Sequence, residues 1–342
     1  MKKTSTNQSV YFGLCTIKFN LFILAFLLYP FANLLNAQVA ELWEPIPLNP
    51  ATAVLSSLDQ TDTNRRNLIT QRVANASNVD LIIIGNSITH YWEWNTYTES
   101  YGNLTNGRNV LNMGLTAEVT PGMLHSLLER GNGGWTNLPQ GVKPKVVMIM
   151  AGTNNCFRSG FSGMQGHNTP PAEVADGIRA ITQVFARKFP TARVINLGIF
   201  PNTLHDLWGP INKISADYYD NKQVFHVNLQ DRFLNSDSTV NLDLFNDGIH
   251  PNNDGYNQWV LGVDQLLTDL LARNPLNPVK IMHMGGSITE GLDADKSYRR
   301  YMDPLIRQAG NIVDFVGSRT VHNGSKPKYY HYDWEHEATW GQ

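Results

Sequence analysis

A serine at the end of an apolar run is the first residue whose position suggests chemistry. Ser87 follows LIIIG at residues 81–85, and a polar and aromatic stretch that could begin a helix comes after it. A hydroxyl at such a strand-to-helix turn lies at the carboxyl edge of a parallel sheet, where ligands bind in open α/β folds. A nucleophilic serine also needs a base, a group that orients the base and donors for the oxyanion.

An acid and a base stand three residues apart near the other end of this region. Asp247 and His250 lie in the segment NDGIHPNNDGY at residues 246–256, which contains glycine and proline. A carboxylate at that spacing can accept a hydrogen bond from one imidazole nitrogen while the other nitrogen faces a serine. Taken alone, the segment fits a loop histidine beside a helix-capping aspartate equally well. Together with Ser87 it predicts a catalytic triad.

Two further segments could supply donors for an oxyanion. Gly114 ends the run VLNMG, and the backbone N–H of a glycine can face a site without obstruction by a side chain. Asn154 follows the run that ends at Gly152, and its side-chain amide can bind a developing alkoxide. Each residue alone is more often part of a turn. We expect the backbone N–H of Ser87, that of Gly114 and the amide of Asn154 to form the oxyanion hole.

The elements that must position these residues form an alternating pattern. Short β-branched runs alternate with amphipathic stretches, which predicts a parallel sheet covered by helices. A helix is expected over residues 170–189 and a last helix from about residue 254 to 273. The predicted strands are residues 81–85, 110–114, 146–152, 193–200 and 224–228.

The order Ser, Gly, Asn and Asp-x-x-His, each just beyond a strand, resembles the four blocks of the SGNH, or GDSL-type, hydrolase superfamily. The resemblance covers residues from about 80 to 273, and KPKVVMIMAGTNN and AEVADGIRAI are similar to the branch of platelet-activating-factor acetylhydrolases. It implies a flavodoxin-like three-layer α/β/α sandwich, and it assigns Ser87, Gly114, Asn154 and His250 as signature residues. One departure is Asn86, where the family has Asp; we expect this to reduce or alter activity without abolishing it.

The sequence then repeats its own opening. After a proline-containing linker at residues 274–278, VKIMHMGGSITEG follows the pattern of DLIIIGNSITH at 80–90. Residues 279–342 resemble the start of a second SGNH-like domain of the carbohydrate esterase family 3 type, through the segments GGSITEG, SYRRYMDPLI, VDFVGS and HEATWG. By that resemblance Ser287 matches the nucleophile and Gly341 the oxyanion glycine.

This second unit departs from its family in ways that bear on activity. Gly286 replaces the usual Asp and Ala338 a usual Gly, and no later Asn or Asp-x-x-His block follows. Without a base it cannot turn over by the family mechanism. We expect the sequence to be cut short of a two-esterase protein, and residues 38–273 to contain all the activity.

Composition and the amino-terminal segment bound the possible partners. Formal net charge is -2 and charged residues are 16% of the 342 residues, so no basic field exists to bind nucleic acid. Lys2 and Lys3 precede the apolar run LFILAFLLYPFANLL at 21–35, which predicts a signal peptide over residues 1–37 and a secreted or periplasmic protein without a stable membrane anchor. A retained anchor is the alternative. After cleavage only Cys156 remains, so no internal disulfide is expected.

The combined prediction is a secreted serine esterase that removes acetyl groups from carbohydrates. A short-chain lipid or aryl esterase or a thioesterase is the alternative with the same chemistry. A non-catalytic carbohydrate-binding or scaffold protein with a degenerate fold is the alternative of another class. No cofactor or metal is expected, because the histidines lack metal-ligand spacing. Tyr91, Trp92 and Trp94 could line an acyl or sugar pocket, although such residues more often fill the core.

Overall fold

The structure is a computed structural model that describes residues 42–43, 63–128, 134–156, 169–291, 297–319 and 335–338. The predicted signal peptide at residues 1–37 and Gly341 lie outside these residues. No helix in the described part of the chain is both long and apolar enough to cross a bilayer.

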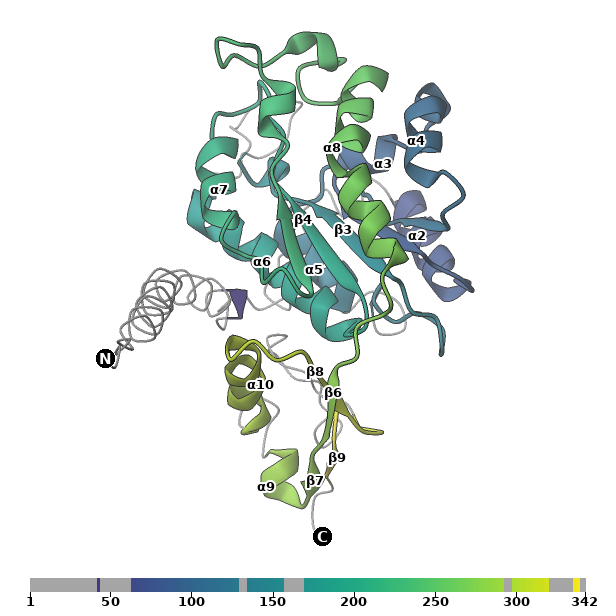
Figure 1. Ribbon diagram of the computed structural model, residues 1–342, viewed down its shortest axis with the longest axis vertical. Helices are drawn as coiled ribbons and strands as arrows, with labels where there is room; N and C mark the ends of the chain where they lie inside the picture. The colour runs from purple at the N-terminus through teal and green to yellow at the C-terminus, as the bar shows by residue number, and fades with distance from the viewer. Residues whose placement is uncertain are drawn as a thin grey trace, which may run out of the picture.

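A five-stranded parallel sheet forms the centre of the structure (Figure 1). Its order is β2-β1-β3-β4-β5, so the chain changes direction across the sheet beside β1. All five predicted strands are present. Three of them (β2, β3 and β4) end two or three residues earlier than predicted, and β5 ends one residue earlier. The strands are β1 (Leu81–Gly85), β2 (Val110–Asn112), β3 (Val146–Met150), β4 (Arg193–Leu197) and β5 (Val224–Val227), of which β1 ends where predicted.

Helices cover both faces of this sheet and make the three layers that the sequence predicts. One face packs against α2 (Thr63–Ala74), α5 (Thr120–Leu128), α6 (Pro171–Lys188) and α7 (Trp208–Ser215). The other packs against α3 (Ser87–Tyr91), α4 (Thr98–Thr105) and α8 (Asn253–Ala272). Strands β1 and β3 are buried on both sides, which is why their sequences are almost continuously apolar.

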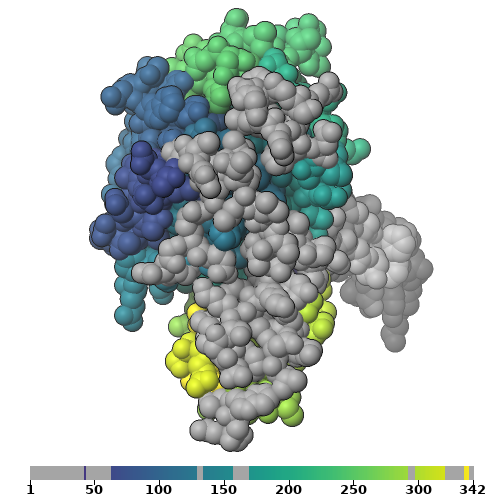
Figure 2. Space-filling model, turned by 180° about the vertical axis from the view of Figure 1, so that it is seen from behind, coloured from purple at the N-terminus to yellow at the C-terminus, as the bar shows by residue number. Residues whose placement is uncertain are grey.

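Smaller elements follow the last helix of the sandwich. Strand β6 (Val279–Met282) pairs in parallel with β8 (Val313–Val316), and β7 (Met284–Gly285) pairs with β9 (Glu337–Ala338). Helices α9 (Ser287–Glu290) and α10 (Arg299–Gln308) lie between them. In both views these yellow-green elements and the green segment around residues 230–250 occupy opposite ends of the molecule (Figure 1, Figure 2).

The repeat seen in the sequence recurs in the backbone. Asn86 before α3 has φ -91° and ψ -149°, and Gly286 before α9 has φ -90° and ψ -153°. A Cβ on Gly85 would lie 2.2 Å from Oγ1 of Thr89, and one on Gly285 would lie 2.4 Å from Oγ1 of Thr289. The two strand-to-helix turns therefore share one conformation, while the assignment of residues 279–342 as the start of a second SGNH-like domain stays a prediction.

The C-terminal elements are joined to the sandwich by a buried junction. The carboxylate of Asp303 on α10 lies 2.7 Å from Nε of Arg187 on α6 and 2.8 Å from Nε of Arg307. Both guanidinium groups also lie over the ring of Trp43. Residues 274–278 have no regular secondary structure, yet Leu276 N–H donates to the carbonyl of Thr191, so this stretch is held against the amino end of β4.

Candidate active site

Ser87 begins helix α3 directly beyond the carboxyl end of β1. The turn is tight, because a Cβ on Gly85 would approach the carbonyl oxygen of Met150 to 2.5 Å. The side chain of Asn86 caps the helix, its Oδ1 accepting a hydrogen bond from the N–H of Ile88 at 2.9 Å. As the first helical residue, Ser87 has a backbone N–H without an intrahelical acceptor.

Asn86 explains how the turn tolerates the departure from the family Asp. The carbonyl of the amide accepts the capping hydrogen bond as a carboxylate oxygen would. Its Nδ2 is buried and has no hydrogen-bond partner among the described residues. The substitution therefore keeps the turn and leaves one buried donor unsatisfied.

The structure brings Ser87, His250 and Asp247 into one hydrogen-bonded line. Nε2 of His250 lies 2.9 Å from Oγ of Ser87, and Nδ1 lies 2.7 Å from Oδ2 of Asp247. With the proton on Nδ1, Nε2 is free to accept the hydroxyl proton. This is the arrangement of a serine nucleophile with its general base and an orienting carboxylate.

The turn that carries the acid and the base is fixed by its own backbone. Oδ1 of Asp247 accepts hydrogen bonds from the N–H groups of Ile249 and His250 at 3.0 and 2.8 Å. Burial opposes ionisation of Asp247, but these hydrogen bonds and the one from the imidazole outweigh it and hold its pKa below the usual value. The carboxylate is therefore charged at neutral pH and can stabilise an imidazolium.

Asn154 lies in the short helix η4 (Thr153–Cys156) beyond β3, almost completely buried. Its Nδ2 donates one hydrogen bond to the carbonyl of Glu118 at 3.0 Å. An amide nitrogen carries two protons, so a second one remains for an oxyanion. The place of Asn154 beyond β3 and its second N–H proton support the predicted oxyanion role, which stays a prediction.

Gly114 does not have the free donor that was predicted for it. Its N–H donates to Oδ1 of Asn112 at 2.8 Å and so is not available to an oxyanion in this structure. The glycine is needed for another reason, since a Cβ there would lie 2.3 Å from the backbone nitrogen of His90. Gly114 lets strand β2 approach the nucleophile helix, and the expectation of an N–H directed at the site is corrected.

Sequence reasoning missed the residues that hold this region together. Asn112 accepts from Gly114 and donates to the carbonyl of Thr89, and Arg65 donates to both the carbonyl of Gly114 and Oδ1 of Asn112. The signal that could have found them is a buried-type strand ending in asparagine. Nothing in the sequence around Arg65 distinguishes it from a surface arginine.

The aromatic cluster after the nucleophile divides between the site and the core. The ring of Tyr91 lies 5.1 Å from that of His250 and 3.9 Å from that of Trp94, whose side chain is 45% exposed. Trp92 is completely buried and stacks on Tyr256. Of these three residues, only Tyr91 and Trp94 can therefore meet a ligand at the triad, while Trp92 fills the core, the more frequent of the two roles expected from the sequence.

Other candidates from the sequence are less well equipped. Burial raises the pKa of the Cys156 thiol to about 11, so it is protonated at neutral pH and a poor nucleophile. Ser287 begins α9, and no hydrogen bond of its hydroxyl is seen in the described part of the chain. The same part holds no group of three or more His, Cys, Asp or Glu residues arranged to bind a metal ion.

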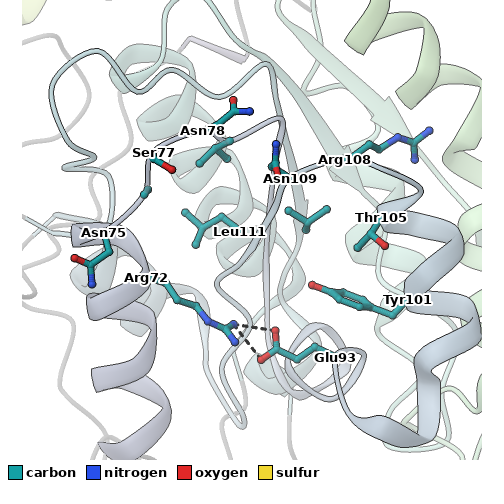
Figure 3. Close-up of a pocket in the computed structure, with 13 residues that line it drawn as sticks. Arg72, Asn75, Ser77, Asn78, Glu93, Tyr101, Thr105, Arg108, Asn109 and Leu111 are labelled. Carbon is teal, nitrogen blue, oxygen red and sulfur yellow. Dashed lines mark hydrogen bonds and ion pairs between the residues drawn. The ribbon is translucent and has the colours of Figure 1, made fainter.

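A pocket of about 770 Å³ lies away from the triad, at the amino ends of β1 and β2. Figure 3 shows Arg72 and Glu93 facing each other across its wall, with Nη1 of Arg72 at 2.9 Å from Oε2 of Glu93. Tyr101 also lines it, and burial together with the charge of Glu93 raises its pKa to about 12. None of its lining residues belongs to the triad.

Comparison with known proteins identifies the region that carries the triad. The profile of the GDSL-like lipase/acylhydrolase family matches residues 83–258. The chain is 27% identical over 204 residues to the alpha2 subunit of platelet-activating factor acetylhydrolase IB of Rattus norvegicus, covering 57% of this chain and 79% of the relative. The human alpha1 subunit is 26% identical over 201 residues, with 57% and 78% covered.

Solved structures are also similar to the chain. A GDSL-like lipase from Bacteroides thetaiotaomicron has a TM-score of 0.46 at 18% identity, with 60% of this chain and 98% of that one covered. A carbohydrate esterase of family 3 from Talaromyces cellulolyticus has a TM-score of 0.38 at 18% identity, with 56% and 99% covered.

Proposed function

The chain belongs to the GDSL-like lipase/acylhydrolase family, and from that premise we propose that it is a serine esterase that removes acetyl groups from carbohydrates. The observation that carries the reaction class is the hydrogen-bonded line from Ser87 through His250 to Asp247. The residues needed for acyl transfer meet at one edge of one sheet.

The geometry supports a two-step reaction. His250 Nε2 takes the proton of Ser87 Oγ as that oxygen attacks the ester carbonyl, and the resulting imidazolium is stabilised by Asp247. The imidazolium returns its proton to the leaving alcohol, which gives an acyl-enzyme on Ser87. Water activated by the same histidine then releases the acid. The oxyanion is bound by the backbone N–H of Ser87 and the side-chain amide of Asn154.

The preference for acetyl groups rests on the relatives. The matched mammalian proteins are named acetylhydrolases, and this chain covers more than two thirds of their length. A carbohydrate as the alcohol is supported by Tyr91 and Trp94, an aromatic pair beside His250 on which a sugar ring can stack. The low formal charge is also consistent with a neutral polymeric substrate.

Substrate profiling tests this proposal. Purified protein is assayed with acetylated xylan, acetylated glucomannan and p-nitrophenyl esters from acetyl to octanoyl, with Ser87→Ala as the inactive control. We expect acetate release from a polysaccharide and rates on the p-nitrophenyl esters that fall steeply with chain length. Rates that rise toward octanoyl, without release of acetate from either polysaccharide, would instead support a lipid esterase.

Two separate proposals concern the amino-terminal and C-terminal segments. We propose that residues 1–37 are removed on export, on the basis of Lys2, Lys3 and the apolar run that follows. Intact-mass measurement of protein recovered from the periplasm or medium of an expressing bacterium tests this, and a mass that includes residue 1 contradicts it. The common turn geometry at Ser87 and Ser287 supports residues 279–342 as the start of a second SGNH-like unit.

A further inference from the structure

The segment Gly114–Glu118, which leads from β2 to α5, holds an unfavourable backbone conformation. Ala117 has φ +60°, in the left-handed region that residues with a Cβ rarely adopt. Such a conformation costs about 1 kcal/mol or more and persists only where the surrounding structure imposes it. Two consecutive arginines on helix α2 contact this segment, one at each end.

Arg65 holds the start of the segment. Its side chain is 3% exposed, and its Nε donates to the carbonyl of Gly114 at 2.9 Å. Its Nη2 donates to Oδ1 of Asn112 at 3.2 Å, the atom that also accepts the N–H of Gly114. Glu93 pairs with Arg65 from the other side, and Figure 3 shows the same carboxylate bound to Arg72 at the pocket wall. This guanidinium is therefore fixed on several sides.

Arg66 holds the end of the segment. Its Nη2 lies 3.1 Å from Oε2 of Glu118, and the two side chains are 6% and 5% exposed. Room for the carboxylate exists only because residue 122 is glycine, since a Cβ there would lie 1.9 Å from Oε1 of Glu118. A buried ion pair with so little freedom fixes the position of the whole residue, including its backbone carbonyl.

That carbonyl is the group that orients the oxyanion amide. Glu118 O accepts one proton of Asn154 Nδ2 at 3.0 Å, which leaves the second proton with a single direction. We propose that Arg65 and Arg66 are positioning residues for acyl transfer: through Gly114 and Glu118 they set the direction in which Asn154 donates to the oxyanion. Helix α2 precedes residue 83, where the family match begins. The inference rests on the proposed serine-esterase chemistry, but not on the identity of the alcohol.

A double-mutant cycle tests this with the full chain and p-nitrophenyl acetate. Arg66→Met should lower kcat about 10- to 100-fold with little change in KM, because a displaced catalytic group loses transition-state stabilisation rather than substrate binding. In an Asn154→Ala background the same change should lower kcat by less than about twofold, since the amide through which it acts is already absent. If Arg66→Met folds poorly, Glu118→Gln replaces it in the test. This variant keeps the shape of the side chain and removes its charge, and it should lower kcat by a similar factor.

Matched controls separate positioning from a general loss of stability. Arg179→Met removes another buried arginine, whose ion pair with Asp176 lies within α6, and should leave kcat unchanged. Arg66→Lys keeps the charge and should restore part of the lost kcat. An unchanged kcat in folded Arg66→Met and Glu118→Gln, or equal losses with and without Asn154, would overturn the inference. Full activity of Ser87→Ala or Asn154→Ala would instead overturn the proposed chemistry.

Discussion

The carboxylate of Asp303 lies 2.7 Å from the guanidinium of Arg187, and the two side chains are 0% and 3% exposed although 116 positions separate them. Burial opposes ionisation of Asp303, but the charges and hydrogen bonds of Arg187 and Arg307 outweigh it and hold its pKa below the usual value. Helices α6 and α10 are therefore joined by a charged contact that water does not reach.

Replacing this carboxylate should destabilise the protein strongly. Asp303→Asn leaves two buried guanidinium groups without a counter-charge, and we expect the free energy of unfolding at pH 7 to fall by about 3–5 kcal/mol. Urea unfolding measures this. Asp269→Asn, an exposed aspartate on α8, is the control and should have little effect.

The difference in unfolding free energy between wild type and Asp303→Asn should depend on pH. Since folding lowers the pKa of Asp303, its contribution is present above the unfolded value of about 3.9 and is lost as pH falls through the folded pKa. The difference between wild type and Asp303→Asn should shrink below pH 4. A difference that grows on acidification would contradict the ion-pair explanation.

Removal of residues 274–342 should separate stability from activity. It exposes Arg187 and Trp43, so the thermal midpoint should fall. The triad lies at the opposite edge of the sheet, and kcat on p-nitrophenyl acetate should stay within about twofold, as expected for distant, independent sites. Thermal unfolding and initial rates on the same preparation check both parts. A folded truncated chain without activity would show that the C-terminal elements complete the site.

Asp247→Asn should keep the fold and lose most of the activity. The amide oxygen can still accept the N–H groups of Ile249 and His250, so the turn remains. It cannot hold the imidazole in the same tautomer equally well, and we expect kcat to fall about 10³- to 10⁴-fold. Asp243→Asn, an exposed aspartate in the preceding short helix η6 (Leu242–Leu244), should retain activity.

Ser87 and His250 should act as one unit. Ser87→Ala and His250→Ala should each abolish turnover, and the double variant should lose little more than either single one. Single-turnover rates with p-nitrophenyl acetate, together with circular dichroism to confirm folding, provide the measurement. Losses that multiply would mean that the two residues do not share the proton transfer.

Trp94 and Trp92, two residues apart, should respond differently to truncation. Trp94→Ala should raise KM for an acetylated oligosaccharide while leaving p-nitrophenyl acetate turnover unchanged, because an exposed ring contributes only to binding of the sugar. Trp92→Ala should instead cost about 3–5 kcal/mol of stability, as loss of a buried ring does. An unchanged KM in Trp94→Ala would argue against stacking at this position.

The sheet could be predicted because the burial of its central strands is visible in their sequences. Residues 81–85 and 146–150 are buried at every position, so their sequences are unbroken apolar runs that no exposed element would carry. The acid and the base could also be predicted from the sequence, because Asp247 and His250 are three residues apart and lie in one local turn. The hydrogen bond between His250 and Ser87 could then be predicted, because both residues were expected beyond the carboxyl ends of strands in the same parallel sheet.

Hydrogen bonds and ion pairs between buried polar groups could not be predicted in the same way. The N–H of Gly114 is occupied by Asn112, a competition that depends on the rotamer of one side chain. Arg65 and Arg66 look like the charged surface of a helix, and their partners Gly114 and Glu118 lie about 50 residues further on. Such a network has no periodicity, so only the assembled fold reveals it.

The placement of the C-terminal junction has a consequence for how this protein could change. Leu276 is held at the amino end of β4, while Ser87, Asn154 and His250 lie beyond carboxyl ends of the strands. Substitutions that remodel the acyl and alcohol pockets are thus separated by the depth of the sheet from substitutions at the C-terminal junction. Substitutions at the carboxyl edge of the sheet could change the substrate without lowering the stability that the C-terminal junction contributes. The effects of substitutions selected separately at the two places should therefore add when they are combined.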